Sequence, residues 1–143
     1  MNFHIFSRSD ALTFNPDQLT YVIRIFSSWS QTFEKRPLQE SPLYLTVKEY
    51  LFDDNDQFYQ AGPKTIDDAL ATEIVDDFAK GRGNAECLLV HCGRGINRAP
   101  AVALALNEIF QLGNDTQRLR EQYKVLNQYV YQTLMAAAGR RSS

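Results

Sequence analysis

The chain has 143 residues, of which 44% are hydrophobic, and its formal net charge is −2. This length and composition fit one globular domain, and the balanced charge gives no general preference for nucleic acid. No stretch approaches the ~18 consecutive apolar residues of a membrane span, and the opening "MNFHIFSRSDALTF" lacks the pattern of a secretory signal. We therefore expect a cytoplasmic protein with one domain over residues 1–138 and a disordered tail over 139–143.

The first half of the chain has the composition of strands separated by polar loops. "FHIF" predicts a short opening strand, "TYVIRIFSS" (20–28) an inner strand, and "LYLTVKEYLFDD" (43–54) a strand that ends in an acidic loop. "QTFEKRPLQESP" carries two prolines and "NDQFYQAGPK" a Gly-Pro pair, so both segments predict loops.

A helix is predicted after the second loop. Thr65 and Asp68 form a T-x-x-D start signal, and Gly81 with Gly83 marks the end of the helix. Apolar residues recur every four positions between these signals and indicate one buried stripe; they are Ile66, Leu70, Ile74 and Phe78.

The last third of the chain predicts one strand and two helices. "AECLLVH" (85–91) is a short apolar strand, and residues 96–112 form a helix with Pro100 in its first turn and Gly113 after its end. A final helix begins at 114 or 115, with an apolar face of Leu119, Tyr123, Leu126, Val130 and Leu134. This order predicts an α/β fold with a central, mostly parallel sheet of about four or five strands flanked by helices.

The turn "HCGRGINR" (91–98) joins the last strand to the helix that follows it, where ligands of parallel sheets bind. Gly93 and Gly95 are expected to supply unusual dihedrals, so that backbone N–H groups converge on an anion at the helix start. Arg98 adds a planar fork that matches two phosphate oxygens. The amide dipoles and Arg98 favour the thiolate of Cys92. These groups predict attack on phosphorus, a phosphocysteine intermediate and its hydrolysis by water.

His91 to Arg98 resembles the H-C-x-x-G-x-x-R signature of the cysteine-dependent protein tyrosine phosphatase superfamily, and the short chain resembles its compact dual-specificity members. A chain of this length meets these four fixed residues by chance roughly once in a thousand cases. The resemblance implies that Cys92 is the nucleophile, that Arg98 binds phosphate and stabilises the transition state, and that His91 orients the loop. It implies a phosphate cradle of backbone amides that runs through Gly93, Arg94, Gly95, Ile96 and Asn97 to Arg98.

The leaving alcohol needs a proton, and in this superfamily an upstream aspartate supplies it. "FDDND" (52–56) resembles the Phe-acidic-Asp pattern of some compact members, which places the general acid at Asp54. Asp53 and Asp56 remain alternatives, and each of the three is otherwise a solvated loop carboxylate. The Arg94 side chain either adds positive charge at the mouth of the site or is a solvated loop arginine.

Ala99 departs from the superfamily, whose members usually carry Ser or Thr directly after the arginine. That hydroxyl helps the thiolate to leave, so Ala99 predicts slow phosphocysteine hydrolysis. Plant glucan phosphatases of the superfamily also carry Arg-Ala-Pro, and Gly-Ile-Asn-Arg is similar to the RNA 5′-phosphatase branch, although the low basic content argues against a nucleic-acid channel.

The expected activity is hydrolysis of a phosphomonoester without cofactor or metal, and the expected substrate is a phosphoprotein carrying phosphotyrosine or phosphoserine/threonine. The alternatives are a low-turnover phosphate-binding or substrate-trapping pseudophosphatase and a phosphatase of RNA ends or phosphoglucan. A sulfurtransferase or arsenate reductase fits the Gly95 and Arg98 spacing least well. Cys87 is expected to be a small core residue and not a disulfide partner of Cys92.

Overall fold

A parallel sheet lies in the middle of the fold in this computed structural model, which describes residues 1–28, 35–54 and 64–142. Within those ranges the sheet has four strands in the spatial order β1-β4-β2-β3. Adjacent strands all run parallel, so their carboxyl ends meet at one edge. The predicted α/β class is therefore confirmed. The strands are β1 (Asn2–Ser7), β2 (Thr20–Phe26), β3 (Tyr44–Leu51) and β4 (Cys87–Cys92).

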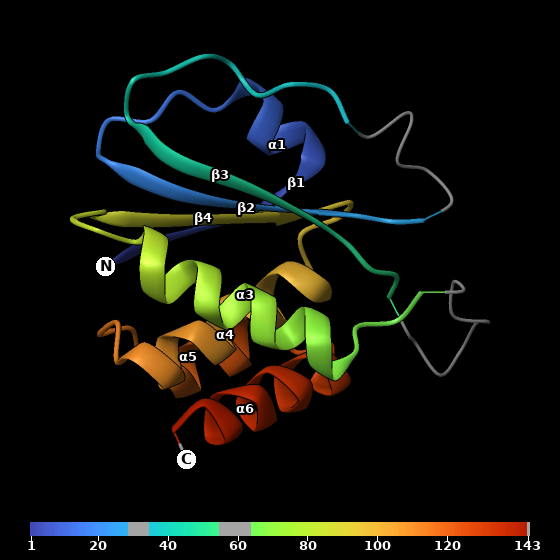
Figure 1. Cartoon of the computed structure of the whole chain (residues 1–143). Helices are drawn as coiled ribbons and strands as arrows, with labels where there is room; N and C mark the ends of the chain where they lie inside the picture. Colours follow the sequence, from blue (N-terminus) through green and yellow to red (C-terminus); the bar gives the residue numbers. More distant parts are fainter. Residues whose placement is uncertain (29–34, 55–63, 143) are drawn as a thin grey trace.

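Helices cover both faces of this sheet (Figure 1). The short α1 (Arg8–Thr13) lies on one face, and the other described helices form a thicker layer on the opposite face. Because both faces are covered, every residue of the inner strands β2 and β4 is buried, which explains their continuous apolar runs. The helices of the thicker layer are α3 (Asp68–Gly81), α4 (Arg98–Phe110), α5 (Thr116–Gln122) and α6 (Gln128–Ser142).

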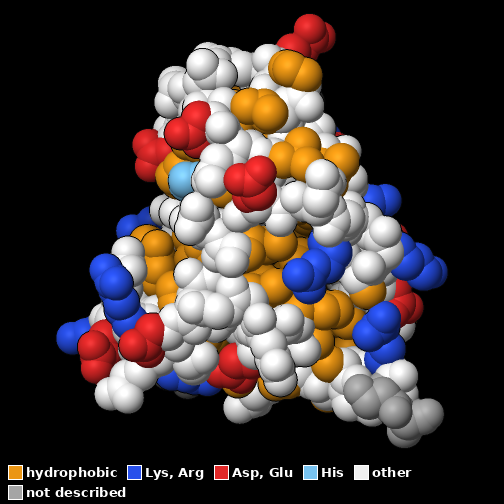
Figure 2. Space-filling model, turned by 90° about the vertical axis from the view of Figure 1, so that its left-hand side faces the viewer, with side chains coloured by type: hydrophobic (Ala, Val, Ile, Leu, Met, Phe, Trp, Pro, Cys, Tyr) orange, Lys and Arg blue, Asp and Glu red, His pale blue; other side chains and the backbone are white. Residues whose placement is uncertain are grey.

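The face of the molecule at the amino ends of the strands lies opposite the edge where the strands end. Figure 2 shows hydrophobic atoms in the middle of this face, with Lys and Arg side chains beside them and acidic side chains elsewhere on it. Within the described ranges, no helix combines the length and the apolar character needed to cross a membrane.

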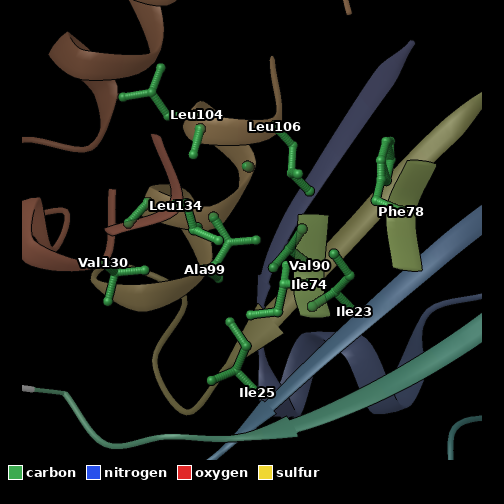
Figure 3. Packing of buried hydrophobic residues seen from close by; sticks show 14 of the residues in the cluster. Ile23, Ile25, Ile74, Phe78, Val90, Ala99, Leu104, Leu106, Val130 and Leu134 are labelled. Carbon is green, nitrogen blue, oxygen red and sulfur yellow. The ribbon is translucent and has the colours of Figure 1, made fainter. Parts of the chain in front are cut away.

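The main core lies between the sheet and the helical layer, with α4 at its centre. Residues 98–107 of α4 are all buried, because the helix packs on β1 and β4 on one side and on α6 on the other. In Figure 3 the side chains of Ile23 and Val90 from the sheet lie close to that of Ile74 from α3, whereas Leu134 of α6 lies apart from them, towards Val130. This packing fixes the start of α4, which follows directly from the 91–98 turn.

Two helix starts differ from the prediction because side-chain caps decide them. The helix expected to begin at Thr65 begins at Asp68, where the Asp67 carboxylate accepts from the Leu70 N–H at 2.8 Å. Ile66 lies outside the helix but is still buried in the core. The helix α1 was not predicted; it begins where the Ser7 hydroxyl accepts from the backbone N–H of Asp10 at 3.1 Å.

The predicted single C-terminal helix is two helices. Asn127 separates them, because its side-chain oxygen accepts from the Val130 N–H at 3.0 Å and so starts α6. The apolar stripe survives the break, since Leu126, Val130 and Leu134 are all buried. The helix α6 reaches Ser142 and thus extends into residues 139–143, where a disordered tail was expected.

Candidate active site

The 91–98 turn lies at the carboxyl end of β4, with Cys92 as the last residue of the strand and Arg98 as the first of α4. Cys92 is 2% exposed and is the register partner of Ser7 in β1. Its Sγ accepts a hydrogen bond from the Gly95 N–H at 3.2 Å. The structure thus brings the predicted nucleophile together with an amide of the predicted cradle.

Two features of this turn require glycine at position 95. Its φ is +77°, in the left-handed region that favours glycine. A Cβ there would also lie 2.6 Å from backbone atoms of Phe6 and Ser7, so the turn packs directly on the end of β1. The expectation of unusual dihedrals is confirmed for Gly95 but is wrong for Gly93, which is not among the positive-φ glycines of the described chain.

The Arg98 side chain makes one hydrogen bond to the described residues. The residue is 7% exposed, and its Nη1 donates to the Phe52 carbonyl at 2.7 Å. Its Nε is buried and has no hydrogen-bond partner among the described residues. An unsatisfied buried donor is costly, and a phosphate oxygen is a suitable acceptor for a charged guanidinium. Arg98 therefore has a free donor next to a loop whose amides suit an anion.

Asp53, one alternative for the general acid, is tied into the fold. Its carboxylate is buried and accepts from the Ser28 N–H at 2.8 Å, the Ser28 hydroxyl at 2.5 Å and the Lys64 N–H at 3.0 Å. Burial acts to raise the pKa of Asp53, but these hydrogen bonds and the charge of Arg98 lower it below its ordinary value. A carboxylate so stabilised is a poor proton donor near neutral pH.

Asp54 is half-buried and has a different contact. Its Oδ1 accepts from the side-chain nitrogen of Asn127 at 2.6 Å. The backbone N–H of Asn127 donates to the Asn97 carbonyl at 3.0 Å, so Asn127 links Asp54 to the candidate phosphate loop. Since Arg98 holds the carbonyl of Phe52, two residues before Asp54, the acidic segment is joined to the loop twice. Asp56 lies outside the described residues.

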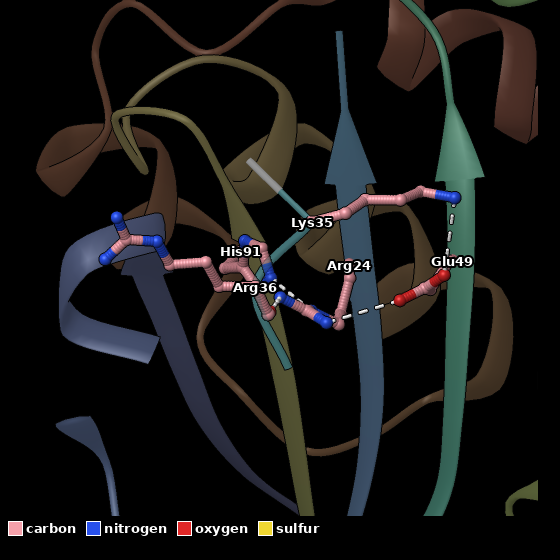
Figure 4. Close-up of polar contacts among 5 residues, drawn as sticks. All are labelled: Arg24, Lys35, Arg36, Glu49 and His91. Carbon is pink, nitrogen blue, oxygen red and sulfur yellow. Dashed lines mark hydrogen bonds and ion pairs between the residues drawn. The ribbon is translucent and has the colours of Figure 1, made fainter. Parts of the chain in front are cut away.

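His91 is 1% exposed, and its Nε2 accepts from Nε of Arg24 at 2.9 Å (Figure 4). Burial, followed by the positive charge of Arg24, lowers the pKa of His91 to about 4, while an interaction with the Cys92 backbone acts in the opposite direction. An unfolded histidine binds its proton below about 6.5. The contribution of His91 to stability is therefore present above that pH and is lost as the pH falls towards 4.

Sequence reasoning missed three residues that support this site: Arg24, Ser28 and Asn127. The sequence could have indicated Arg24, because it is a single arginine within the apolar run "TYVIRIF" and a buried charge needs partners. Ser28 and Asn127 are ordinary polar residues outside regular elements, and nothing in their local sequence marks them.

Neither cysteine forms a disulfide, and their surroundings differ. Cys87 is buried at the opposite end of β4, where its thiol donates to Gln18 at 2.9 Å and burial raises the pKa of the thiol. This agrees with the expected core role of Cys87. Among the described residues, no group of three or more His, Cys, Asp or Glu side chains is arranged to hold a metal ion.

Comparison with known proteins finds a structural likeness and no sequence match. No family model matches the sequence, and no curated protein matches it. The crystal structure of the human tyrosine phosphatase-like serine/threonine/tyrosine-interacting protein matches with a TM-score of 0.55 and 17% identity, over 99% of this chain and 91% of that one. At this identity the likeness shows the fold alone. The chain therefore has the α/β fold of a tyrosine phosphatase-like protein.

Proposed function

We propose that this protein is a dual-specificity-type phosphatase that hydrolyses phosphomonoesters through a phosphocysteine. The observation that carries the proposal is the buried Arg98 guanidinium, whose Nε has no partner among the described residues, at the end of a turn that begins with Cys92, whose Sγ accepts from the Gly95 N–H. In the first step Sγ bonds to phosphorus, the ester P–O bond breaks and Asp54 protonates the leaving oxygen. In the second step water attacks phosphorus, the S–P bond breaks and Asp54 takes up the water proton.

Positive charge around the loop supports an anionic substrate. The backbone N–H of Arg8 donates to the Gly93 carbonyl at 3.2 Å. Arg8 and Arg36 line a cavity of about 240 Å³ together with Ser9 and Leu12, and Arg94 is exposed. Such charge attracts a phosphate dianion. We propose a phosphoprotein as the substrate class and, because a thiolate needs reducing surroundings, a cytoplasmic location.

Turnover of an aryl phosphate at pH about 6 tests this proposal. We expect Cys92→Ser to lower the rate at least about 1,000-fold, because it removes the nucleophile. Cys87→Ser is the matched control, since it changes the other cysteine of the chain at the far end of the same strand. Equal rates for Cys92→Ser and the wild type, or no turnover by the wild type, contradict the proposal.

The second candidate function is phosphate capture with little turnover, and Ala99 favours it. Ala99 is fully buried in the first turn of α4 and offers no hydroxyl to the departing thiolate. In this case the wild type releases one equivalent of aryl alcohol in a burst and then almost stops. Steady multiple turnover without such a burst rules this candidate out.

Ala99→Ser addresses the same step directly. We expect the steady-state rate after the burst to rise by about 10-fold, because one added hydrogen bond would stabilise the leaving thiolate by roughly 1.4 kcal/mol. Ala101→Ser is the matched control, because Ala101 is equally buried in the same helix. A steady-state rate that rises equally in both variants shows that the hydroxyl does not act on the thiolate.

A further inference from the structure

Arg24 is a buried charge in the middle of an inner strand. The residue is 3% exposed, and every residue of β2 is buried. Burying a charge is unfavourable unless it is paired and fully hydrogen-bonded. The guanidinium donates from Nε to Nε2 of His91 at 2.9 Å, from Nη1 to Glu49 at 3.2 Å and from Nη2 to the Arg36 carbonyl at 2.5 Å (Figure 4). Its orientation is therefore set by three partners from different segments.

The neighbours of Arg24 hold it in this position. Glu49 of β3 lies on the side away from His91 and also pairs with Lys35 at 3.6 Å (Figure 4). The Phe26 ring lies 5.0 Å from the guanidinium carbon and packs edge-on against His91 at 5.8 Å. Burial lowers the pKa of Arg24 and Glu49 raises it, and an arginine in a protein stays charged.

The bond from Arg24 decides which nitrogen of His91 carries a proton. A guanidinium N–H can only donate, so Nε2 must accept and the neutral ring carries its proton on Nδ1. Nδ1 is buried and has no hydrogen-bond partner among the described residues. The backbone of Cys92 also interacts with the ring and acts to raise its pKa.

Positive charges from three segments disfavour a protonated His91. Arg24 faces the ring from β2, Arg8 from α1 and Arg98 from α4, and all three lower the pKa of His91. Protonation would also turn Nε2 into a donor and break its bond with Arg24.

We propose that Arg24 is a positioning residue of the candidate active site, which holds His91 in the Nδ1-protonated neutral form directly before Cys92 and so keeps the start of the loop aligned. Arg24 acts through His91 and does not itself reach the reacting atoms. Only the kinetic consequence rests on the proposed phosphatase function, because the state of the ring can be measured without turnover.

Nitrogen-15 NMR of the histidine rings tests the proposal in the wild type. The chain has two histidines, so His4 serves as an internal reference. We expect the His91 ring to be protonated on Nδ1 and not on Nε2 from pH 8 to pH 5. In Arg24→Met we expect both neutral forms and a higher midpoint of protonation, because the cation and its donor are gone. A wild-type proton on Nε2 overturns the proposal.

A kinetic test compares Arg24→Met with the control Arg118→Met, which removes an exposed arginine distant in sequence from Arg24. We expect kcat to fall by about 10-fold or more with little change in KM for Arg24→Met alone, because the loop loses its alignment. Arg24→Gln replaces Arg24→Met if that variant does not fold; its amide can either donate or accept, so it should mix the two ring forms. An unchanged ring state and kcat in the Arg24 variant that folds overturn the proposal. A wild type without turnover contradicts the phosphatase function and leaves the NMR result to decide the role of Arg24.

Discussion

Arg98→Lys should lower kcat/KM for an aryl phosphate by at least about 100-fold, the cost of losing one preorganised donor to a transition-state oxyanion. The guanidinium makes its contact with the Phe52 carbonyl through Nη1 and leaves Nε for the phosphoryl group. A lysine keeps the charge but has no planar fork, so it cannot serve both partners with fixed geometry. Steady-state kinetics of the purified variant provide the measurement.

Two controls separate this effect from a change in folding. Arg118→Lys is the matched control, because it makes the same replacement at an exposed arginine. Inorganic phosphate should protect the wild type, but not Arg98→Lys, from alkylation of Cys92, since phosphate and the alkylating reagent compete for one site. A variant that folds normally and keeps kcat/KM within a factor of about three would falsify the proposed role of Arg98.

Asp54→Asn should lower kcat by about 100-fold for substrates with poor leaving groups, within the range of one general acid. The effect should be much smaller for p-nitrophenyl phosphate, whose leaving group hardly needs a proton. The hydrogen bond that Asp54 accepts from Asn127, which also contacts the Asn97 carbonyl, supports this proposed role.

Asp53→Asn should instead act on stability. The Asp53 carboxylate accepts three hydrogen bonds, and an amide NH₂ would meet donors from Ser28 or Lys64. We expect the free energy of unfolding to drop by roughly 2 kcal/mol, with kcat for poor leaving groups nearly unchanged. Denaturant titration and steady-state rates of both variants with poor leaving groups decide the matter; a loss of kcat for such substrates in Asp53→Asn alone would assign the general acid to Asp53.

Much of the fold could be predicted because it depends on local patterns. The apolar runs of β2 and β4 report burial on both faces, and the Ile74 and Phe78 spacing reports one buried helix face. The predictions that failed concern caps. Asp67 and not Thr65 starts α3, and Asn127 divides the last helix. Caps depend on single side-chain hydrogen bonds, and several polar residues near an end compete for that role.

Likewise, the sequence alone predicts one part of the candidate site, and the tertiary structure decides the other part. The sequence by itself determined the order of strand, loop and helix around residues 91–98, and it placed Cys92, Gly95 and Arg98 there, since contiguous residues stay together in any fold. The need for glycine at position 95 has a further cause, because the backbone of β1 lies against it.

Only the tertiary structure decided which groups surround that loop. It separated Asp53, held by Ser28 and Lys64, from Asp54, held by Asn127 across 73 positions of the chain. It also brought Arg24 to His91 across 67 positions. Such contacts arise from the order of the parallel strands and the packing of helices on them, and a hydrogen bond between residues so far apart leaves no periodicity in the sequence.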